Sequence, residues 1–417
     1  MAGGPMSRET LTTRCCVAGG GPAGMMLGLL LARAGVDVVV LEKHADFLRD
    51  FRGDTIHPST LELMHELGWL EEFLELPHQK APYLRFQSGS YDVVMGDFTH
   101  LPTHARFIAF MPQWDFLNFL ARKGSAYPGF HLRMRAKVTE LIREGNRVVG
   151  VLADTPEGTL EVRSELLVAA DGRGSTVREK AGLAVQDFGA PMDVLWFRIP
   201  RELGDPVDPM GRFENGQIFI MINRTDAWQC GRVIPKGSYE QVRARGLDAF
   251  REDLVRVAPF TADRVSAIRD WEDVKLLTVR VDRLSTWYQP GLLCIGDAAH
   301  AMSPVGGVGI NLAIQDAVAA ANLLAGPLRE GRVDTDLLRQ VQRRRELPTR
   351  LIQRMQVLIQ DNVLGRALRA DGLGTNGRLP WPVRLASQFP VLRRIPARLI
   401  GLGIRPEHVR SPESARM

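Results

Sequence analysis

The stretch Gly19-Gly20-Gly21-Pro22-Ala23-Gly24 is the sharpest pattern in this 417-residue sequence. It follows an apolar run at residues 14–18, which predicts a strand, and opens an apolar run at residues 25–34, which predicts a helix. A second strand is predicted at residues 36–41, and it ends in Glu42. Glycines between a strand and a helix, with an acid closing the next strand, are typical of a βαβ unit that binds a dinucleotide.

Each part of this pattern has a physical role in dinucleotide binding. Gly19 allows the tight turn, Gly21 lets the backbone approach a pyrophosphate, and Gly24 lets the helix pack closely on the strand. Glu42 follows Gly24 by 18 residues and can accept hydrogen bonds from ribose hydroxyls. The predicted contacts come from the turn and from the end of the second strand: Gly19, Gly21, Pro22, Ala23, Gly24, Glu42 and Lys43.

Two later turns also place an acid and a glycine after a predicted buried strand. The first is Asp171-Gly172, which follows the apolar run 165–170. The second is Gly296-Asp297, whose loop runs through further glycines to an apolar helix predicted at residues 312–324. A carboxylate can accept from a ligand hydroxyl, and the free N–H groups of a helix N-terminus favour an anionic group. FAD is long enough to touch all three turns, and it explains the third turn better than NAD does.

Composition excludes several other classes of protein. A hydrophobic share of 45% and a charged share of 24% are those of a globular protein. The net charge of +5 comes from 53 basic and 48 acidic residues without a dense basic block, so nucleic acid is not an expected partner. The four cysteines lack metal-ligand spacing, and we expect no metal. Without a signal-peptide core or an apolar run near ~20 residues, we expect no transmembrane segment and a cytoplasmic protein.

The rest of the chain predicts an α/β fold with an inserted sheet. Strands dominate residues 131–170, whereas residues 82–110 show no regular period and are interpreted as irregular. Strands rich in Trp, Phe, Ile and Val recur over residues 190–281, interrupted by one predicted helix at Tyr239–Val257. We predict a Rossmann-like FAD-binding domain, an inserted β-sheet substrate domain that could wall an apolar pocket, and a helical C-terminal segment. The predicted boundaries are 11–185 and 284–330 for the two parts of the FAD-binding domain, 186–283 for the substrate domain and 331–417 for the helical C-terminal region.

The C-terminal region is predicted to be helical and basic. Asp336–Val363 is interpreted as a long basic helix that bends at Pro348. The segment Trp381–Ile404 mixes arginines with apolar side chains, which suits a peripheral membrane contact or an apolar partner, including a homodimer contact. The interpretation we favour is that it packs on the body of the protein with its arginine heads in solvent.

The three turns, in this order and spacing, resemble a known family. They are similar to those of the single-component FAD-dependent aromatic hydroxylases, the para-hydroxybenzoate hydroxylase type, also called group A flavoprotein monooxygenases. The resemblance runs from about Cys15 to about Leu324. Its carriers are the glycine turn with Glu42, then Asp171-Gly172-Arg173-Gly174-Ser175, then Gly296-Asp297-Ala298-Ala299-His300 with Pro304 and Gly307-Val308-Gly309-Ile310-Asn311.

The resemblance implies further FAD contacts. Arg52, which composition alone would make a solvated arginine, resembles the family's arginine that contacts FAD near a mobile loop. Asp171 belongs to the motif linked to both FAD and nicotinamide use, and Asp297 is expected at the ribityl chain. Pro304 is expected beside the flavin ring. The remaining implied contacts are Gln113 before a helix, Val138 beside the adenine, and Gly307, Gly309, Ile310 and Asn311 toward the pyrimidine end of the ring.

The resemblance also implies a reaction. NADH or NADPH binds transiently and reduces the flavin, O2 adds at flavin C4a, and the hydroperoxide passes a hydroxyl to an aromatic or other apolar electron-rich small molecule. No catalytic side chain is assigned, since the cofactor carries the chemistry. His57 and His300 lie near the expected flavin edge, where a single histidine is more often a structural hydrogen-bonding residue.

Three alternatives stay open on the sequence. A flavin-dependent halogenase would carry a Trp-x-Trp-x-Ile-Pro element, and here Leu195 and Phe197 stand at the two tryptophan positions. An FAD-dependent reductase or dehydrogenase of a lipid-like or polyketide-like substrate would use the same fold without oxygen transfer. A non-catalytic flavoprotein sensor would bind its ligand without turnover.

Overall fold

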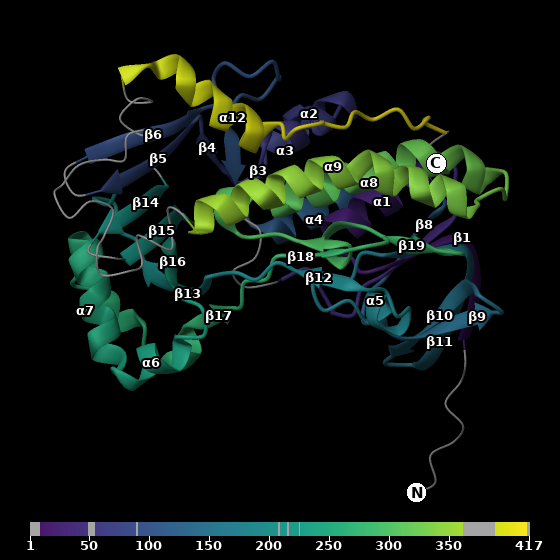
Figure 1. Ribbon diagram of the computed structural model, residues 1–417, viewed down its shortest axis with the longest axis horizontal. Helices are drawn as coiled ribbons and strands as arrows, with labels where there is room; N and C mark the ends of the chain where they lie inside the picture. The colour runs from purple at the N-terminus through teal and green to yellow at the C-terminus, as the bar shows by residue number, and fades with distance from the viewer. Residues whose placement is uncertain are drawn as a thin grey trace, which may run out of the picture.

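A computed structural model describes residues 9–48, 55–88, 91–206, 209–214, 217–224, 226–361 and 388–414. An eight-stranded sheet and a seven-stranded sheet lie at opposite ends of the molecule, and long helices bridge them on one side (Figure 1). The predicted α/β class with a second sheet is confirmed.

The centre of the eight-stranded sheet is parallel. β1 (Glu9–Ala18) pairs with β2 (Val38–Leu41) on one side and with β11 (Gly158–Ala169) on the other. β8 (Phe130–Arg133) continues the sheet beyond β2, and β20 (Leu292–Cys294) continues it beyond β11, where β19 (Tyr288–Gln289) forms the edge. Because parallel strands end at one edge, the turns that follow β1, β11 and β20 lie side by side.

An antiparallel extension of β11 differs from the prediction. β9 (Lys137–Glu144) and β10 (Arg147–Thr155) pair with each other, and β10 pairs with β11. The buried strand predicted at the apolar run 165–170 begins earlier, because β11 is one continuous strand, Gly158–Ala169. The polar residues Arg163 and Ser164 interrupt the apolar pattern but keep ladder partners in β1.

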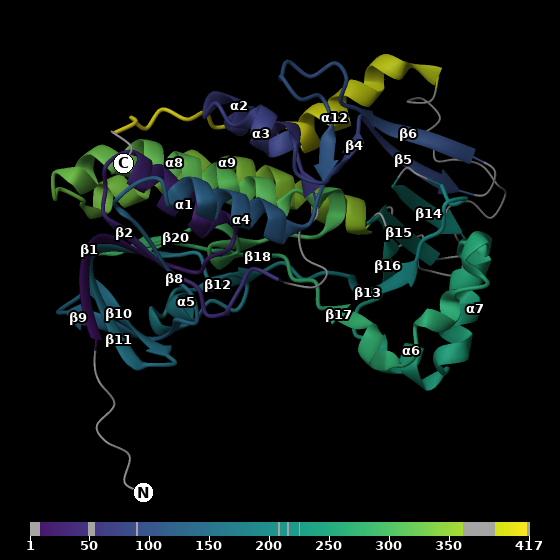
Figure 2. The same ribbon diagram turned by 180° about the vertical axis from the view of Figure 1, so that it is seen from behind.

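Four helices cover one face of this sheet (Figures 1 and 2). They are α1 (Pro22–Arg33), α4 (Gln113–Gly124), α8 (Gly309–Arg329) and α9 (Thr335–Ile359). Within the described ranges, one helical stretch, Val305–Arg329, is long and apolar enough to cross a bilayer. Its most apolar window is 78% buried, and α8 packs on both α1 and α9, as the core helix of a globular protein does.

The seven-stranded sheet includes a hairpin from the N-terminal part of the chain. The prediction of an irregular segment at 82–110 was wrong, because half-exposed strands without clean alternation form there and are stabilised by pairing with β14. The order along the sheet is β17 (Lys275–Leu277), β13 (Met192–Pro200), β16 (Ala227–Pro235), β15 (Gln217–Asn223), β14 (Met210–Glu214), β5 (Tyr83–Ser88) and β6 (Tyr91–Asp97).

The helix predicted at Tyr239–Val257 is two helices. α6 (Tyr239–Ala244) and α7 (Leu247–Val257) are separated at Gly246, whose φ of +87° suits glycine far better than other residues. α7 covers one face of the seven-stranded sheet, where Phe250 and Leu254 pack on Leu195 and Phe197 of β13.

The C-terminal residues 388–414 return to the body of the protein. α12 (Arg394–Gly401) packs against β6, and its Ala397 joins a buried cluster with Phe98 and Leu101. Phe389, Val391 and Ile395 stay more than half exposed. The predicted segment Trp381–Ile404 thus packs on the body in its described part, while residues 381–387 lie outside the described residues.

The remaining elements are short. They are β3 (Thr55–Ile56), α2 (Pro58–Glu66), α3 (Leu70–Leu74), β4 (Gln79–Ala81), β7 (Ile108–Phe110), α5 (Thr176–Lys180), β12 (Val185–Asp187), β18 (Asp282–Leu284), β21 (His300–Ala301) and the 3₁₀ turns Pro259–Thr261, Val265–Ala267, Trp271–Asp273, Gly296–Ala298, Val305–Gly307 and Pro390–Arg393.

The four cysteines are buried free thiols. Burial raises the pKa of Cys16 to about 12 and raises the pKa of Cys15, Cys230 and Cys294 as well. Because only the thiolate is a good nucleophile, we expect iodoacetamide at pH 8 to leave all four unmodified in the native protein and to modify all four in urea. Intact-protein mass spectrometry counts the adducts, and rapid native alkylation of any of these thiols would contradict their burial.

Candidate active site

The three acid–glycine turns meet at the carboxyl edge of the parallel strands. Gly19 has φ +107°, and a Cβ there would lie 2.4 Å from the carbonyl oxygen of Ala170. Gly296 has φ +58°, and its Cβ would lie 3.2 Å from the Cβ of Ala23 and 3.1 Å from that of Ala313. Glycine is therefore required at both positions, and the close approach places the turns against each other.

The first turn opens toward solvent at the N-terminus of α1. No side chain of the described residues caps this helix, which leaves its first N–H groups to bind an anion. Among the described residues, no atom lies within 4 Å of a Cβ built on Gly21, whereas a Cβ on Gly24 would lie 1.9 Å from the carbonyl oxygen of Gly19. Gly21 thus borders open space and Gly24 is closely packed, as a turn that cradles a pyrophosphate requires.

Glu42 lies at the end of β2 beside this turn. One carboxylate oxygen accepts from the Gly20 N–H at 2.9 Å, and the other accepts from the His44 N–H at 3.0 Å. The carboxylate thus lies beside the glycine turn, at the end of β2. Lys43 next to it is exposed.

The second turn, at residues 171–175, leads into the short helix α5. Asp171 accepts from the Ser175 hydroxyl at 2.5 Å and from the Val177 N–H at 3.1 Å, so it caps α5. Burial raises the pKa of Asp171, although these hydrogen bonds oppose the shift. Arg173 in the same turn donates through Nε to Asp297 at 3.0 Å, which joins the second turn to the third.

Arg178 is a buried residue that the sequence analysis did not select. Its guanidinium donates to the carbonyl oxygen of Arg173 at 2.5 Å, to that of Ala298 at 3.3 Å and to the carboxylate of Asp282 at 3.4 Å. A buried arginine that bonds two facing loops fixes their separation. Its spacing from Asp171 in the sequence carries no signal of this role.

The third turn leads to the N-terminus of α8, which no side chain in the described part of the chain caps. Gly307 has φ +63°, and its carbonyl oxygen accepts from the Thr55 hydroxyl at 3.1 Å. Gly309 and Ile310 form the first turn of α8 and are partly exposed. The side chain of Asn311 accepts from the His57 N–H at 3.0 Å and from the Thr60 hydroxyl at 2.7 Å, so it anchors the segment before α2.

His57 is a structural hydrogen-bonding residue in this geometry. Its ring is fully buried, and Nδ1 lies 2.8 Å from the carbonyl oxygen of Ile400 in α12. Burial lowers the pKa of His57 to about 4, so the ring is neutral at physiological pH and Nδ1 carries the proton that it donates. It therefore ties α12 to the loop that faces α8.

His300 belongs to a buried ion-pair network. Its Nε2 lies 2.5 Å from Asp316 in α8, which also binds Arg345 of α9 and accepts from the Gly296 N–H at 3.0 Å. The four groups are buried. Sequence reasoning did not select Asp316 or Arg345, because a charged residue inside a helix gives no sign of being buried.

The other predicted residues are placed as follows. Gln113 begins α4 and is half-buried, and Val138 is buried in β9 in a cluster with Val39 and Leu41 of β2. Pro304 is half-buried just before the 3₁₀ turn that precedes α8. Arg52 lies outside the described residues. In the ranges described, no three His, Cys, Asp or Glu side chains gather as metal ligands.

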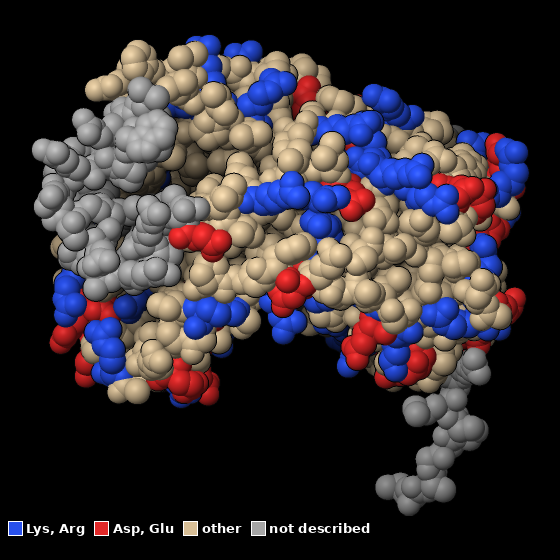
Figure 3. Space-filling view, in the orientation of Figure 1, with Lys and Arg blue, Asp and Glu red and all other residues tan. Residues whose placement is uncertain are grey.

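An apolar wall stands opposite the Pro304 loop. Val305 packs against Val194 and Val233 on the face of the seven-stranded sheet that α7 does not cover. Trp196 is partly exposed on the same face, and a Cβ on Gly231 would lie 3.1 Å from its ring. Ile220 nearby is 36% exposed. Figure 3 shows the molecule hollowed between its two ends on the lower side, with basic and acidic side chains interspersed around the hollow.

Comparison with known proteins agrees with this geometry. The family model described as an FAD binding domain matches residues 12–355. The 6-methylpretetramide 4-monooxygenase of Streptomyces rimosus is 32% identical over 96% of this chain and 94% of its own length. The 12-dehydrotetracycline 5-monooxygenase/anhydrotetracycline 6-monooxygenase of the same species is 32% identical over 72% of this chain and 60% of its own length.

A solved structure is similar as well. The OxyS anhydrotetracycline hydroxylase from Streptomyces rimosus superposes with a TM-score of 0.71 at 26% identity, covering 94% of this chain and 76% of that one. The predictions of an FAD cofactor and of a monooxygenase are thereby confirmed. The chain belongs to the FAD-dependent aromatic hydroxylase family and is an FAD-dependent monooxygenase.

Proposed function

We propose that the chain hydroxylates a fused-ring aromatic compound of polyketide type, with NADH or NADPH as the transient reductant. The observation that carries this proposal is the apolar wall opposite the Pro304 loop, which includes the partly exposed indole of Trp196. A flat ring system can stack on an indole and bury its apolar faces there. The two relatives whose names specify pretetramide and tetracycline substrates, both fused-ring polyketides, support the same class.

We infer that FAD lies across the three turns. The open space at Gly21 and the free N–H groups of α1 suit the pyrophosphate, and Glu42 suits the adenosine ribose. Asp297, whose side chain is 30% exposed, suits the ribityl hydroxyls. The free N–H groups of Gly309 and Ile310 suit the negative charge of a reduced flavin. The further proposed contacts are Gly19, Pro22, Ala23, Gly24, Lys43, Arg52, Gln113, Val138, Asp171, Pro304, Gly307 and Asn311.

Bound FAD would supply oxygen activation and transfer of one oxygen atom to the substrate. The chain itself contributes position and solvent exclusion. The apolar wall keeps water from the reacting atoms, the uncapped N-terminus of α8 stabilises negative charge, and the Pro304 loop sets the gap between wall and cofactor. Among the described residues, His57 and His300 are held in structural hydrogen bonds, so neither is proposed as an acid or base.

The proposed boundaries of the functional units remain those of the sequence prediction, with one addition. The β5–β6 hairpin joins the substrate sheet although it precedes residue 186. We also propose a cytoplasmic location, since four unpaired thiols suit a reducing compartment.

One assay tests the function. The purified holoenzyme is mixed with NADH or NADPH, 18O2 and two panels of phenols, one with a single ring and one with three or four fused rings. We expect fused-ring substrates to stimulate NAD(P)H oxidation and to gain one labelled oxygen atom. Anaerobic reduction of the substrate would instead favour the alternative of a reductase, and preference for single-ring phenols would contradict the proposed substrate class.

Replacing Trp196 with alanine tests whether the apolar wall binds the substrate. We expect KM for a fused-ring substrate to rise about tenfold, equivalent to about 1.4 kcal/mol, while kcat changes less than about threefold, because stacking holds the substrate before and during reaction. Trp196→Phe keeps a ring and is expected to recover most of the loss. Trp271→Ala on the opposite face of the sheet is the matched control. An equal rise of KM in that control would show a general effect on the sheet.

A further inference from the structure

The C-terminal residues 402–414, here called the C-terminal strap, lie beyond the part of the chain that the family model matches. The strap runs from the end of α12 across α8 and toward α1 (Figure 1). Its polar contacts reach α2 through Glu66, α8 through Asn322 and α1 through Arg33. These contacts lie at the surface. The side chain of Glu407, in contrast, is buried.

Glu407 of the strap is 5% exposed and belongs to a chain of charges that is buried on one side. Its carboxylate accepts from Arg344 at 2.7 and 3.0 Å, toward solvent, and from Arg345 Nη1 at 3.3 Å. Arg345 Nε lies 3.0 Å from one oxygen of Asp316. The other oxygen of Asp316 binds the Gly296 N–H at 3.0 Å and His300 Nε2 at 2.5 Å. The strap is thus connected to the third acid–glycine turn through three ionic side chains.

Burial makes each link of this chain strong. Arg345 is 1% exposed and Asp316 is fully buried. In a medium of low dielectric constant, a charge that loses its partner is strongly destabilised, so the side chains keep their positions relative to one another. Burial acts to raise the pKa of Asp316, but His300 and Arg345 outweigh it and hold that pKa below its usual value.

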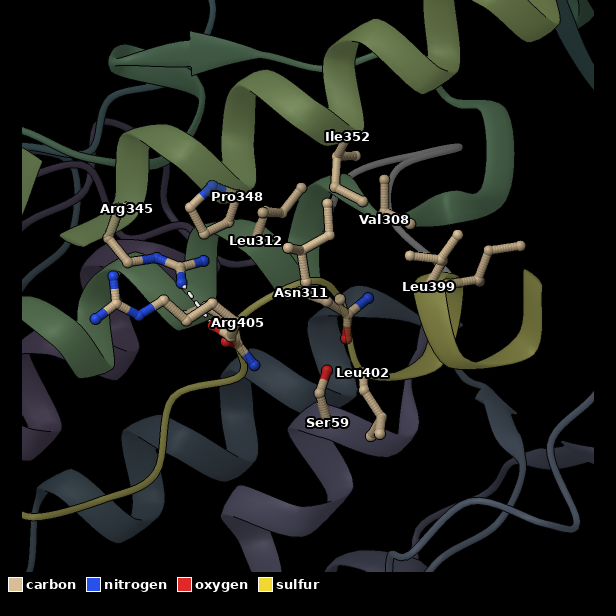
Figure 4. A pocket seen from close by; sticks show the side chains of 14 residues that line it. Ser59, Val308, Asn311, Leu312, Arg345, Pro348, Ile352, Leu399, Leu402 and Arg405 are labelled. Atoms are coloured by element: carbon tan, nitrogen blue, oxygen red, sulfur yellow. Dashed lines mark hydrogen bonds between the residues drawn. The ribbon is translucent and has the colours of Figure 1, made fainter. Parts of the chain in front are cut away.

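Polar contacts rather than close packing hold the strap at this point. A cavity of about 20 Å³, large enough for about one water, remains between the strap and helices α8 and α9 (Figure 4). Gln315 lines this cavity and accepts from the Glu407 N–H at 2.7 Å, while its own Nε2 is buried without a partner in the described residues. Arg345 also donates to the carbonyl oxygen of Arg405 at 3.0 Å, the dashed line in Figure 4.

Gly296 is the point where a displacement would reach the cofactor. It lies between Ala23 at the start of α1 and Ala313 in α8, with no room for a side chain. Its N–H is held by Asp316, and Asp297 follows it directly. Asp316 thus holds the residue that directly precedes Asp297, next to the N-terminus of α1.

We propose that Glu407 is a positioning residue for FAD, acting from the C-terminal strap through Arg345 and Asp316 on the Gly296-Asp297 turn. The inference rests on the FAD placement proposed above and not on the substrate or the reductant. The affinity of the apoprotein for FAD measures the proposed effect of Glu407 directly. A failure of the proposed hydroxylation would leave this measurement unaffected.

The test compares Glu407→Gln with Glu66→Gln. Both remove a carboxylate that holds the strap on the body of the protein: Glu407 lies in the strap and binds α9, and Glu66 of α2 accepts from the Val409 N–H at 2.8 Å and pairs with His408. Only Glu407 is linked to the Gly296-Asp297 turn. We expect the FAD dissociation constant, measured by flavin fluorescence, to rise at least tenfold in Glu407→Gln and to change less than twofold in Glu66→Gln. An unchanged dissociation constant in folded Glu407→Gln, or equal effects in the two variants, would overturn the proposal.

A double variant separates positioning from general stability. His300→Asn removes another partner of Asp316 at the far end of the chain of charges. We expect the combined effect of Glu407→Gln and His300→Asn on the FAD dissociation constant to fall short of the product of the single effects by at least threefold, because both act through Asp316. Independent, multiplying effects would overturn the proposal. If Glu407→Gln does not fold, Glu407→Asp replaces it with the same criteria.

Discussion

Gly24→Ala is expected to prevent FAD binding and to destabilise the protein by about 4 kcal/mol or more, beyond the usual range for overpacking. The added Cβ would lie 1.9 Å from the carbonyl oxygen of Gly19 and 3.2 Å from Val17 Cγ1. Backbone atoms of the glycine turn cannot move aside without moving the turn, because Gly19 itself packs on Ala170. Urea unfolding of the apoprotein and retention of FAD through gel filtration measure the two effects.

Gly21→Ala is the matched control for this prediction. No atom of the residues that the structure describes lies within 4 Å of the Cβ that it would add, and the backbone of Gly21 is extended. We expect its free energy of unfolding to stay within about 1 kcal/mol of the native value while FAD affinity falls about 100-fold, since the new methyl group occupies the pyrophosphate space. A Gly24→Ala protein as stable as Gly21→Ala would show that the turn is not closely packed.

Asp316→Asn is expected to cost about 3–5 kcal/mol of stability at neutral pH, as for other buried ion pairs that lose one partner. The variant keeps the shape of the side chain but leaves Arg345 facing a neutral amide, and an NH2 donor replaces one of the two acceptor oxygens that Arg345, His300 and the Gly296 N–H share. Asp336→Asn is the control, because Asp336 also pairs with an arginine but is 71% exposed. We expect the control to lose less than about 1 kcal/mol. Chemical denaturation at pH 7 compares them.

The pH dependence of the unfolding free energy, compared between the native protein and Asp316→Asn, checks the ionisation state of Asp316. The pKa of Asp316 is held below its usual value in the folded protein, so its ionised form contributes stability above the carboxyl pKa of the unfolded chain, about 3.9. That stability is lost as the pH falls through the folded pKa. The difference in unfolding free energy between native protein and Asp316→Asn should therefore be constant from pH 7 to about pH 5 and shrink below about pH 4. A difference that grows on acidification would mean that Asp316 is protonated in the folded state.

Local pattern was sufficient for the cofactor half of the fold. A strand, a glycine turn, a helix and a second strand ending in an acid are adjacent in the chain, so their geometry follows from short-range rules. The same rules placed turns after β11 and β20, and the parallel order of the strands then brought Gly19, Ala170 and Gly296 to one edge. The family resemblance agreed with the physical reading of these turns.

Local sequence pattern did not predict the elements whose pairing partners are distant in the chain. The β5–β6 hairpin is half-exposed and irregular in sequence, and it forms strands because β14 pairs with it across more than a hundred residues. The break between α6 and α7 depended on the φ of a single glycine. The wall of Trp196 and Val233 comes from strands whose shared face is defined only when they are paired.

The sequence by itself determined the class of cofactor, because a dinucleotide is recognised by glycines and acids at fixed spacing along one βαβ unit and two further turns. Only the tertiary structure decided which charges are buried. Asp316, Arg345 and Glu407 are separated by 29 and 62 residues and look like surface residues of two helices and a tail. They form one buried network because α8, α9 and the C-terminal strap pack together, and burial is a property of the packed molecule rather than of any segment.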